Sequence, residues 1–246
     1  MSPPRGLLFD YGGTLVEERS VDLRAGAEWL FAQAADRPTG VTLADVLERA
    51  ERVTREVADR RNEFHIETPW PTLTRLIHDY FGIRFDAPLE ALELGYWKAS
   101  VETRPMPGAR DALERFHAEG LPMAVVSNSS FGAPVIRREL ARHDLAEHLA
   151  FVLVSADYAV RKPNPLLFEV AAARLGLAPD EIWFVGDRLD TDVRGARDAG
   201  MTAVWFNRNG SSDAARGAGL TFETWEDLSH HVLRARSPLA TPQEPR

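Results

Sequence analysis

Short polar motifs at four places in the chain carry the side chains that phosphoryl transfer uses. That reaction needs a nucleophile, a hydroxyl and a cation that hold an anion, and oxygen ligands for a divalent metal. Taken alone, Asp10 suits a turn and Ser127 suits a helix cap, so each motif also has a simpler interpretation. The four motifs are Asp10 before Gly-Gly-Thr, Ser127-Asn128 after Val-Val, Lys162 within Arg-Lys-Pro, and Gly186-Asp187 after Trp-Phe-Val.

Three carboxylates gather in the fourth motif. Asp187, Asp190 and Asp192 fall within six residues at the start of a predicted helix. Carboxylates this close repel one another unless a cation or a helix N-terminus stabilises them. Hard oxygen ligands in a chain without cysteine favour Mg²⁺. We therefore expect a magnesium site here, with Asp190 as an exposed carboxylate that takes no part in it.

Lys162 stands out because arginine is the ordinary cation of this chain. Among 29 lysines and arginines, only Lys98 and Lys162 are lysines. A lysine in this background favours a compact point charge over the planar fork of a guanidinium. We therefore expect Lys162 to hold an anion, whereas Lys98, beside Trp97 in a helical stretch, is interpreted as a surface residue.

Apolar runs alternate with helical patterns in most of the chain and predict the elements that carry these motifs. This alternation predicts an α/β fold, a doubly wound parallel sheet with right-handed crossovers. The functional loops of such sheets lie at the carboxyl ends of the strands, so we expect the four motifs to meet at one edge. Strands are expected at 6–9, 123–126, 151–154, 182–185 and 202–206, and helices near 109–119, 133–141, 165–175 and 190–199. Residues 220–222 and 225–233 are expected to complete the core.

Residues 16–104 interrupt the alternation. Apolar residues recur there at spacings of three and four, and proline-containing breaks at 68–71 and 86–88 separate the helical stretches. We expect no strand in this segment. The sequence thus predicts a core of residues 1–15 and 105–236, an inserted all-helical cap of residues 16–104, and a loose C-terminal tail of residues 237–246.

Composition excludes several classes of function. With 29 basic against 37 acidic side chains, the net charge of −8 has the wrong sign for a nucleic-acid or anionic-membrane partner. The absence of cysteine excludes disulfides, thiolate nucleophiles and cysteine zinc sites. No apolar stretch reaches the ~20 residues of a membrane helix. We expect a cytoplasmic location, and the sequence does not indicate an oligomeric state.

The ordered motifs resemble those of the haloacid dehalogenase superfamily. The resemblance spans residues 5 to about 210, and although each motif is loose, four of them in this order are highly specific. The insertion after the first motif is similar to the family's helical cap of type C1, which contributes substrate contacts above a Rossmann-like core. The motifs are Phe9-Asp10-Tyr-Gly-Gly-Thr-Leu15, Val126-Ser127-Asn128, Arg161-Lys162-Pro-Asn-Pro165, and Val185-Gly186-Asp187 followed by Asp192.

The resemblance implies a role for each matching residue. It assigns Asp10 as the nucleophile that becomes an aspartyl phosphate, and Lys162 as the cation that bridges nucleophile and phosphate. For Mg²⁺ it implies the ligands Asp10, Asp187, Asp192 and the backbone carbonyl of Gly12. For the substrate it implies Ser127 as a donor to the phosphate, together with Gly13, Thr14 and Asn128.

The chain departs from the family's phosphatases two residues after the nucleophile. A second aspartate there usually protonates the leaving group, but this chain has Gly12. General acid–base catalysis contributes roughly 10²- to 10⁴-fold, so the loss must be compensated or tolerated. One possibility is a magnesium phosphatase whose substrate has a good leaving group, or whose cap supplies the acid.

Hydrolysis of a different bond is a second possibility. The family's phosphonate hydrolases and 2-haloacid dehalogenases also lack the second aspartate. The former need a cap lysine, for which Lys98 is the candidate, and the latter act without metal, which leaves Asp187 and Asp192 without a purpose. A weakly active member that binds a partner or ligand is the third possibility, although the otherwise complete site argues against it.

The sequence therefore favours magnesium-dependent hydrolysis of a small phosphate monoester, with a small phosphorylated metabolite as the partner. The part of the cap most expected to face the core is the break that contains Glu63, His65, Glu67, Thr68 and Trp70. His65 lies between two glutamates, but we interpret it as part of a solvated helix end rather than as a metal ligand.

Overall fold

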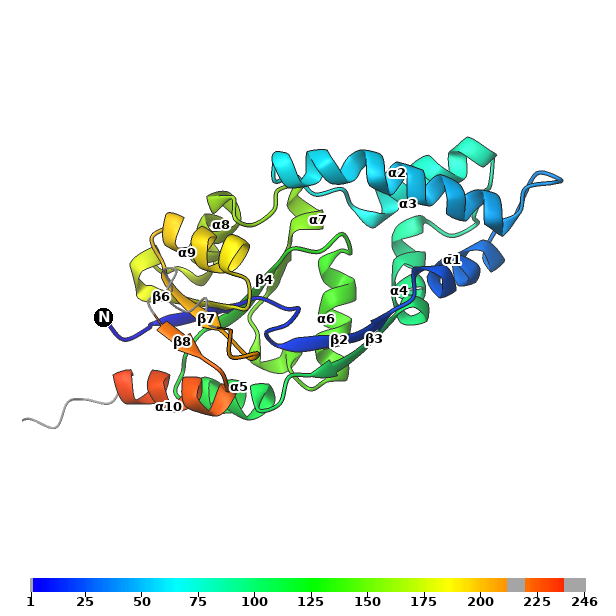
Figure 1. The fold of residues 1–246 in the computed structure, drawn as a ribbon. Helices are drawn as coiled ribbons and strands as arrows, with labels where there is room; N and C mark the ends of the chain where they lie inside the picture. Colours follow the sequence, from blue (N-terminus) through cyan, green and yellow to red (C-terminus); the bar gives the residue numbers. More distant parts are fainter. Residues whose placement is uncertain (1, 212–219, 237–246) are drawn as a thin grey trace, which may run out of the picture.

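A six-stranded parallel sheet forms the centre of the molecule (Figure 1). The computed structural model describes residues 2–211 and 220–236. The sheet has the order β5-β4-β1-β6-β7-β8, and every neighbouring pair is parallel. This confirms the predicted doubly wound α/β fold. The strands are β1 (Gly6–Phe9), β4 (Met123–Ser127), β5 (Val152–Val154), β6 (Ile182–Gly186), β7 (Thr202–Phe206) and β8 (Leu220–Phe222).

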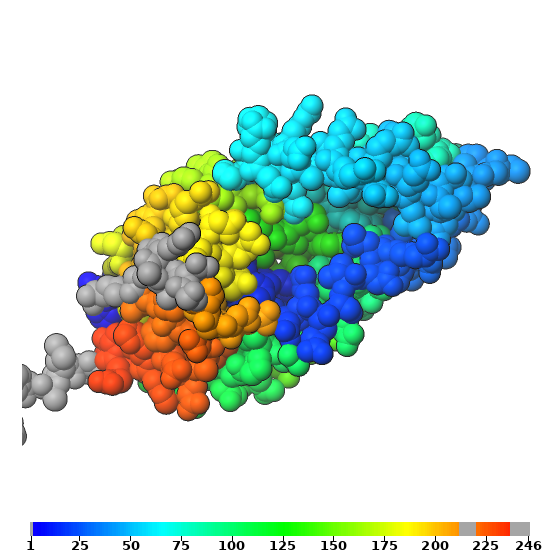
Figure 2. Space-filling model, viewed as in Figure 1, coloured from blue at the N-terminus to red at the C-terminus, as the bar shows by residue number. Residues whose placement is uncertain are grey.

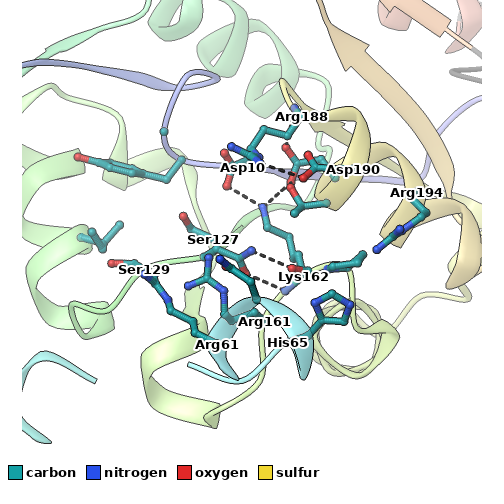
Figure 3. A pocket seen from close by; sticks show the side chains of 18 of the residues that line it. Asp10, Arg61, His65, Ser127, Ser129, Arg161, Lys162, Arg188, Asp190 and Arg194 are labelled. Carbon is teal, nitrogen blue, oxygen red and sulfur yellow. Dashed lines mark hydrogen bonds and ion pairs between the residues drawn. The ribbon is translucent and has the colours of Figure 1, made fainter. Parts of the chain in front are cut away.

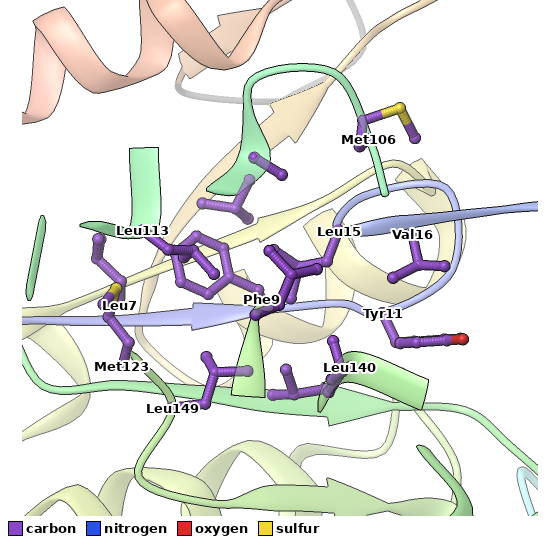
Figure 4. Packing of buried hydrophobic residues seen from close by; sticks show 14 of the residues in the cluster. Leu7, Phe9, Tyr11, Leu15, Val16, Met106, Leu113, Met123, Leu140 and Leu149 are labelled. Atoms are coloured by element: carbon purple, nitrogen blue, oxygen red, sulfur yellow. The ribbon is translucent and has the colours of Figure 1, made fainter. Parts of the chain in front are cut away.

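Helices cover both faces of the sheet. Along β1, Leu7 and Phe9 pack into one apolar cluster and Leu8 into the other, because successive strand residues point to opposite faces. Figure 4 shows the first cluster around Phe9 and Leu113. Burial on both faces explains why the strands are continuously apolar. On the first face lie α5 (Ala109–Ala118), α6 (Ala133–Arg142) and α10 (Trp225–Arg236), and on the second lie α8 (Pro165–Leu175) and α9 (Arg194–Asp198).

Short helical turns complete the core. The predicted helix at 190–199 begins as a π-helical turn, Leu189–Val193, and continues as α9. Such turns often occur at functional sites, and this one carries Asp192. The other short turns are 3₁₀ turns at Ala146–His148 and Pro179–Glu181 and the single-turn helix α7 (Ser155–Tyr158).

Four helices form a separate layer beside the core (Figure 1). They pack on apolar clusters of their own, one around Val46 and Ile77 and one around Leu30 and Trp70. The helices are α1 (Leu23–Ala32), α2 (Leu43–Glu63), α3 (Trp70–Phe81) and α4 (Leu89–Ser100). Trp97 of α4 packs into the first core cluster instead, so the two parts also share apolar contacts. The division into core and cap at the expected boundaries stays a prediction.

The expectation that residues 16–104 contain no strand is wrong. β2 (Val16–Val21) pairs antiparallel with β3 (Val101–Pro105), and this ribbon makes both connections between core and cap. β2 is mostly exposed, and cross-strand charges such as Glu17 with Arg104 line it. A ribbon of exposed charged residues lacks the apolar alternation that signals a strand, and its partner lies about 80 residues away in sequence.

Two further expectations concern membrane-spanning helices and the C-terminal tail. Among the described residues, no helix is both long enough and apolar enough to span a bilayer. The predicted tail, residues 237–246, lies outside the described residues.

Candidate active site

The four polar motifs converge at the carboxyl edge of the sheet. Asp10 follows β1, Ser127 ends β4 and Asp187 follows β6. β1 pairs with both β4 and β6, so the residues that follow these neighbouring strands come together. Lys162 joins them from the loop after α7. Asp10, Ser127 and Lys162 line a cavity of about 570 Å³ (Figure 3).

Lys162 lies at the centre of a buried chain of ion pairs. Its Nζ lies 2.7 Å from Asp10 Oδ1 and 2.7 Å from Asp192 Oδ1, and it donates a hydrogen bond of 2.9 Å to the carbonyl of Val126. The residue is only 2% exposed. Burial alone lowers the pKa of Lys162, but the two carboxylates outweigh burial and raise this pKa above its usual value. The lysine is therefore a fixed cation beside the predicted nucleophile.

Asn128 holds the loop that carries this lysine. Its Nδ2 donates to the carbonyl of Lys162 at 2.9 Å, and its Oδ1 accepts from the backbone N–H of Lys162 at 2.7 Å. The side-chain amide is thus engaged on both sides by the Lys162 backbone. Asn128 also lines the cavity, and its hydrogen bonds position Lys162, while its predicted contact with the substrate stays a prediction.

Three carboxylates form a candidate metal site. Oxygen atoms of Asp10, Asp187 and Asp192 all lie within 4.8 Å of one another. Burial, and then the charges of Asp10 and Asp192, raise the pKa of Asp187 to about 7. Burial also raises the pKa of Asp192 to about 6. Among the described residues, the buried Asp187 Oδ1 has no hydrogen-bond partner. A buried oxygen without a donor, among repelling carboxylates, fits a hard divalent cation such as Mg²⁺.

Two adjacent glycines differ in what they permit. Gly13 has φ +77°, and a Cβ there would lie 2.4 Å from Asp187 Oδ2, so only glycine lets this carboxylate approach the loop. Gly12 has no left-handed φ, and the nearest atom to a Cβ at that position is Glu18 Oε1 at 4.0 Å. The structure therefore leaves room for a Cβ at residue 12, whereas it leaves none at residue 13.

Two residues of the first motif lie outside the cavity of Asp10, and their predicted contact with the substrate stays a prediction. Thr14 is fully buried, and its carbonyl accepts a hydrogen bond of 3.1 Å from Trp225 Nε1. Neither Gly13 nor Thr14 lines the cavity of Asp10. These two residues shape the first loop. The resemblance covers the whole motif, and only coordinates separate its cavity-lining residues from those that support the turn.

The positions of Asp190, Lys98 and His65 agree with the sequence predictions. Asp190 is exposed and forms an ion pair of 2.9 Å with Arg188. Lys98 is exposed and does not line the cavity. His65 does line the cavity, so the break after α2 faces the core. Glu67 forms ion pairs with two arginines, Arg61 and Arg161.

Sequence reasoning missed the arginines of the cavity. Arg61 and Arg161 lie on its cap side, and Arg188 and Arg194 on its core side (Figure 3). Arg161 is the neighbour of Lys162 in the third motif, so its position was a usable signal. Arg61 lies in an arginine-rich helix where spacing alone does not distinguish it from its neighbours.

Comparison with known proteins places this site in a family. A family model described as haloacid dehalogenase-like hydrolase matches residues 4–200. The chain is 42% identical over 103 residues to a phosphoserine phosphatase of Thermus thermophilus, which covers 42% of this chain and 40% of that protein. It is 32% identical over 157 residues to a glyceraldehyde 3-phosphate phosphatase of Pyrococcus furiosus. This match covers 57% of this chain and 64% of that protein. The chain thus spans less than two thirds of either relative.

A solved structure shares the fold across nearly the whole chain. It is a 2-haloacid dehalogenase from Pseudomonas syringae, with a TM-score of 0.67 and 23% identity, covering 95% of this chain and 99% of that one. At 23% identity, this similarity shows a shared fold and nothing about function. The family model matches residues 4–200, which is most of the chain. The chain therefore belongs to the haloacid dehalogenase-like hydrolases.

Proposed function

We propose that this protein is a magnesium-dependent phosphatase that hydrolyses a small phosphate monoester through an aspartyl phosphate at Asp10. The observation that carries the proposal is the buried chain Asp10–Lys162–Asp192, beside a buried Asp187 oxygen that has no donor among the described residues. The phosphatases among the relatives support it, since both are named for small phosphate monoesters.

Binding would use the core side of the cavity. Lys162 Nζ and the hydroxyl of Ser127 would hold the phosphate oxygens in line with Asp10. The ion pair engages Oδ1 of Asp10, so Oδ2 is the oxygen that we assign to attack. Asp10, Asp187, Asp192 and the carbonyl of Gly12 would hold Mg²⁺. When bound, the ion supplies positive charge against the phosphate oxygens.

In the first step, Asp10 Oδ2 forms a bond to phosphorus and the ester P–O bond breaks. Lys162 balances the charge that builds on the phosphoryl oxygens. The leaving alkoxide takes its proton from water, because Gly12 provides no acid. In the second step, a water molecule attacks phosphorus of the acyl phosphate. Inorganic phosphate leaves and the Asp10 carboxylate is restored.

Phosphonate and haloacid hydrolysis fit the cavity less well. A phosphonate hydrolase needs a lysine from the cap, and Lys98 is exposed outside the cavity. A metal-free dehalogenase gives no reason for the clustered oxygens of Asp10, Asp187 and Asp192. A binding role without turnover is separated from the phosphatase by the assay that follows.

The test is phosphate release from p-nitrophenyl phosphate and a panel of small phosphomonoesters, with and without Mg²⁺. We expect release by the wild type that requires Mg²⁺ and is lost in Asp10→Asn. Asp190→Asn serves as the control, since Asp190 is exposed and paired with Arg188. No release from any compound by a folded protein would refute the proposal. Phosphonoacetaldehyde and 2-haloacids are the next substrates in that case.

The missing acid sharpens this test. Without a proton donor at residue 12, the rate should fall steeply as the pKa of the leaving alcohol rises. Phenyl phosphates should therefore react much faster than alkyl phosphates. Equal rates across the series would show that another group donates the proton.

A further inference from the structure

A charged network joins the cap to the core at the edge of the cavity. Arg61, near the end of α2, places Nε 2.9 Å from Glu67 Oε1, and Arg161 pairs with Oε2 of the same carboxylate. Glu67 is fully enclosed, with 0% of its side chain exposed. The hydroxyl of Ser155 donates to it at 2.6 Å, and the N–H of Thr68 at 3.1 Å. The carboxylate is thus fixed from both parts of the molecule.

Backbone hydrogen bonds hold this network in register. The N–H of Arg161 donates to the carbonyl of His65 at 2.8 Å, and that of Glu67 to the carbonyl of Ala159 at 3.1 Å. Ile66 and Val160 form a β-bridge between these bonds. The cap segment after α2 is therefore docked strand-like on the core loop that leads to Lys162. This docking sets the distance between the two guanidinium groups.

The network carries an excess of positive charge toward the cavity. Two guanidinium groups share a single carboxylate, which leaves one positive charge uncompensated within the network. Both arginines line the cavity of Asp10, and Figure 3 shows them beside Ser127 and Lys162. In Figure 2, a hollow separates the cap from the core segment near residue 190. Burial lowers the pKa of Arg161, so an anion in the cavity would stabilise its charged form.

The proposed catalysis leaves this charge unused. Lys162, Ser127 and the metal ligands serve the phosphate that is cleaved, and they all come from the core. Arg61 and Arg161 stand at the cap boundary of the same cavity, where the rest of the substrate must lie. Guanidinium groups bind carboxylate and phosphate through two parallel hydrogen bonds.

We propose that Arg61 and Arg161 bind a second anionic group of the substrate. This inference rests on the proposed function. The substrate class is then a small phosphate monoester with a carboxylate or second phosphate at its other end. The relatives do not decide the matter, since phosphoserine carries a carboxylate and glyceraldehyde 3-phosphate ends in an aldehyde.

Matched substrates test the inference. Phosphoglycolate and ethyl phosphate differ by the carboxylate, as do 3-phosphoglycerate and glycerol 3-phosphate, and 1,3-propanediol bisphosphate supplies the second phosphate instead. We expect the wild type to favour the anionic member of a pair by at least ~10-fold in kcat/KM, as charged hydrogen bonds allow. Arg61→Gln should abolish most of this preference through KM and leave the kcat/KM for ethyl phosphate within about 2-fold.

Neighbouring and conservative variants separate recognition from packing. Arg60→Gln removes the same charge from the adjacent, exposed position of α2 and should leave the preference intact. Arg61→Lys keeps the charge without the guanidinium fork and should retain part of the preference, which covers the case in which Arg61→Gln does not fold.

Two results would overturn the inference. An equal loss on both members of a pair in Arg61→Gln, with Arg60→Gln unaffected, would mean that the network only holds the cap. Phosphate release from all monoesters with no preference in the wild type would also refute it while leaving the phosphatase intact. No release from any compound would refute the proposed function instead, so the two failures are distinguishable.

Discussion

The core and the cap boundary bring charges to one cavity but hold them differently. In the core, Asp10, Lys162 and Asp192 are at most 7% exposed, and two ion pairs of 2.7 Å join them. At the cap boundary, the side chains of Arg61 and Arg161 remain 35% and 17% exposed. Charges that are shielded from water interact more strongly than charges in contact with it.

This difference suggests separate roles for the two regions in catalysis and in substrate choice. The core charges come from the end of β1, the loop after α7 and the turn Leu189–Val193, and buried ion pairs hold them together at the sheet edge. Arg61 of the cap and Arg161 of a core loop are held by a short segment that docks between them, so their positions depend on loop geometry. We infer that the core determines the class of reaction and the cap boundary the choice of substrate.

The largest effect is expected from the lysine of the core. Lys162→Met leaves the Asp10, Asp187 and Asp192 carboxylates together without their buried cation. We expect a loss of phosphatase activity of about 10³-fold, as for removal of one preorganised charge. The free energy of unfolding should also fall by about 3 kcal/mol, because the variant removes one partner of a buried ion pair and leaves the other partner buried. Rates with p-nitrophenyl phosphate and urea denaturation measure the two effects.

The second lysine of the chain provides the control. Lys98→Met removes the same charge from an exposed position on α4 and should change neither activity nor stability measurably. Comparable losses in both variants would contradict the distinction between a buried catalytic centre and a solvated cap surface.

Most of the core was predictable because its signals are local. Four of the strands are apolar runs followed by a polar motif, and parallel pairing brings the strand ends together whatever their distance in sequence. For this reason Asp10, Ser127, Lys162 and Asp187 could be grouped from the sequence alone. The role of Asn128 could not be predicted, because its hydrogen bonds to the Lys162 backbone depend on the packing of two loops.

The cap boundary was not predictable in the same way. Arg61 follows Arg60 in a helix rich in charge, and only the docking of residues 65–67 on 159–161 distinguishes them. β2 and β3 were missed because their pairing is non-local and their residues are exposed. Interactions that form between distant segments leave little trace in local periodicity.

The second prediction concerns Gly12, the departure within the core. Gly12→Asp introduces the acid that the family's phosphatases carry, at a position where a Cβ meets no atom closer than 4.0 Å. We expect turnover of ethyl phosphate to rise by roughly 10²-fold and that of p-nitrophenyl phosphate to change little, because only the poor leaving group needs a proton. Gly13→Asp, which would clash with Asp187, should lose activity.

An unchanged rate with ethyl phosphate in a folded Gly12→Asp variant would show that another residue already supplies the acid. Glu18 would be the first residue to test, since its Oε1 lies nearest to the open position and burial raises its pKa. Glu18→Gln should then lower turnover of ethyl phosphate more than turnover of p-nitrophenyl phosphate.

The third prediction uses the pKa of Asp187. In the metal-free protein this pKa is raised from 3.8 to about 7. The protonated carboxyl therefore stabilises the folded protein at low pH, and this contribution is lost as pH rises from about 3.8 through 7. Protons compete with Mg²⁺ for the carboxylate below that pH. Mg²⁺ should therefore raise Tm more at pH 8 than at pH 6, with a gain of about 2.7 kcal/mol at 100 times its Kd. Asp187→Asn should lose this gain, and an equal gain at both pH values would contradict the assignment.

The smallest effect is expected where cap and core meet away from the cavity. Glu93 on α4 accepts a hydrogen bond of 2.9 Å from the N–H of Gly132, at the start of α6. Burial raises the pKa of Glu93 and the hydrogen bond from Gly132 lowers it, and with the nearby charge of Asp157 the pKa rises from 4.5 to about 7. A raised carboxyl pKa stabilises the folded protein at low pH, and this contribution is lost as pH rises from about 4.5 through 7.

Glu93→Gln keeps a hydrogen-bond acceptor and removes the charge. The variant should match the wild type at pH 5 and exceed its unfolding free energy by about 1 kcal/mol at pH 8, because the wild type must then bury a carboxylate. Thermal unfolding across this pH range measures the difference. Glu90→Gln, on the exposed side of the same helix, should show no such pH dependence. A Glu93→Gln variant that is less stable than the wild type at pH 8 would contradict this prediction. It would mean that the charge of the Glu93 carboxylate holds the cap on the N-terminus of α6, as charge holds the arginine network at the cavity.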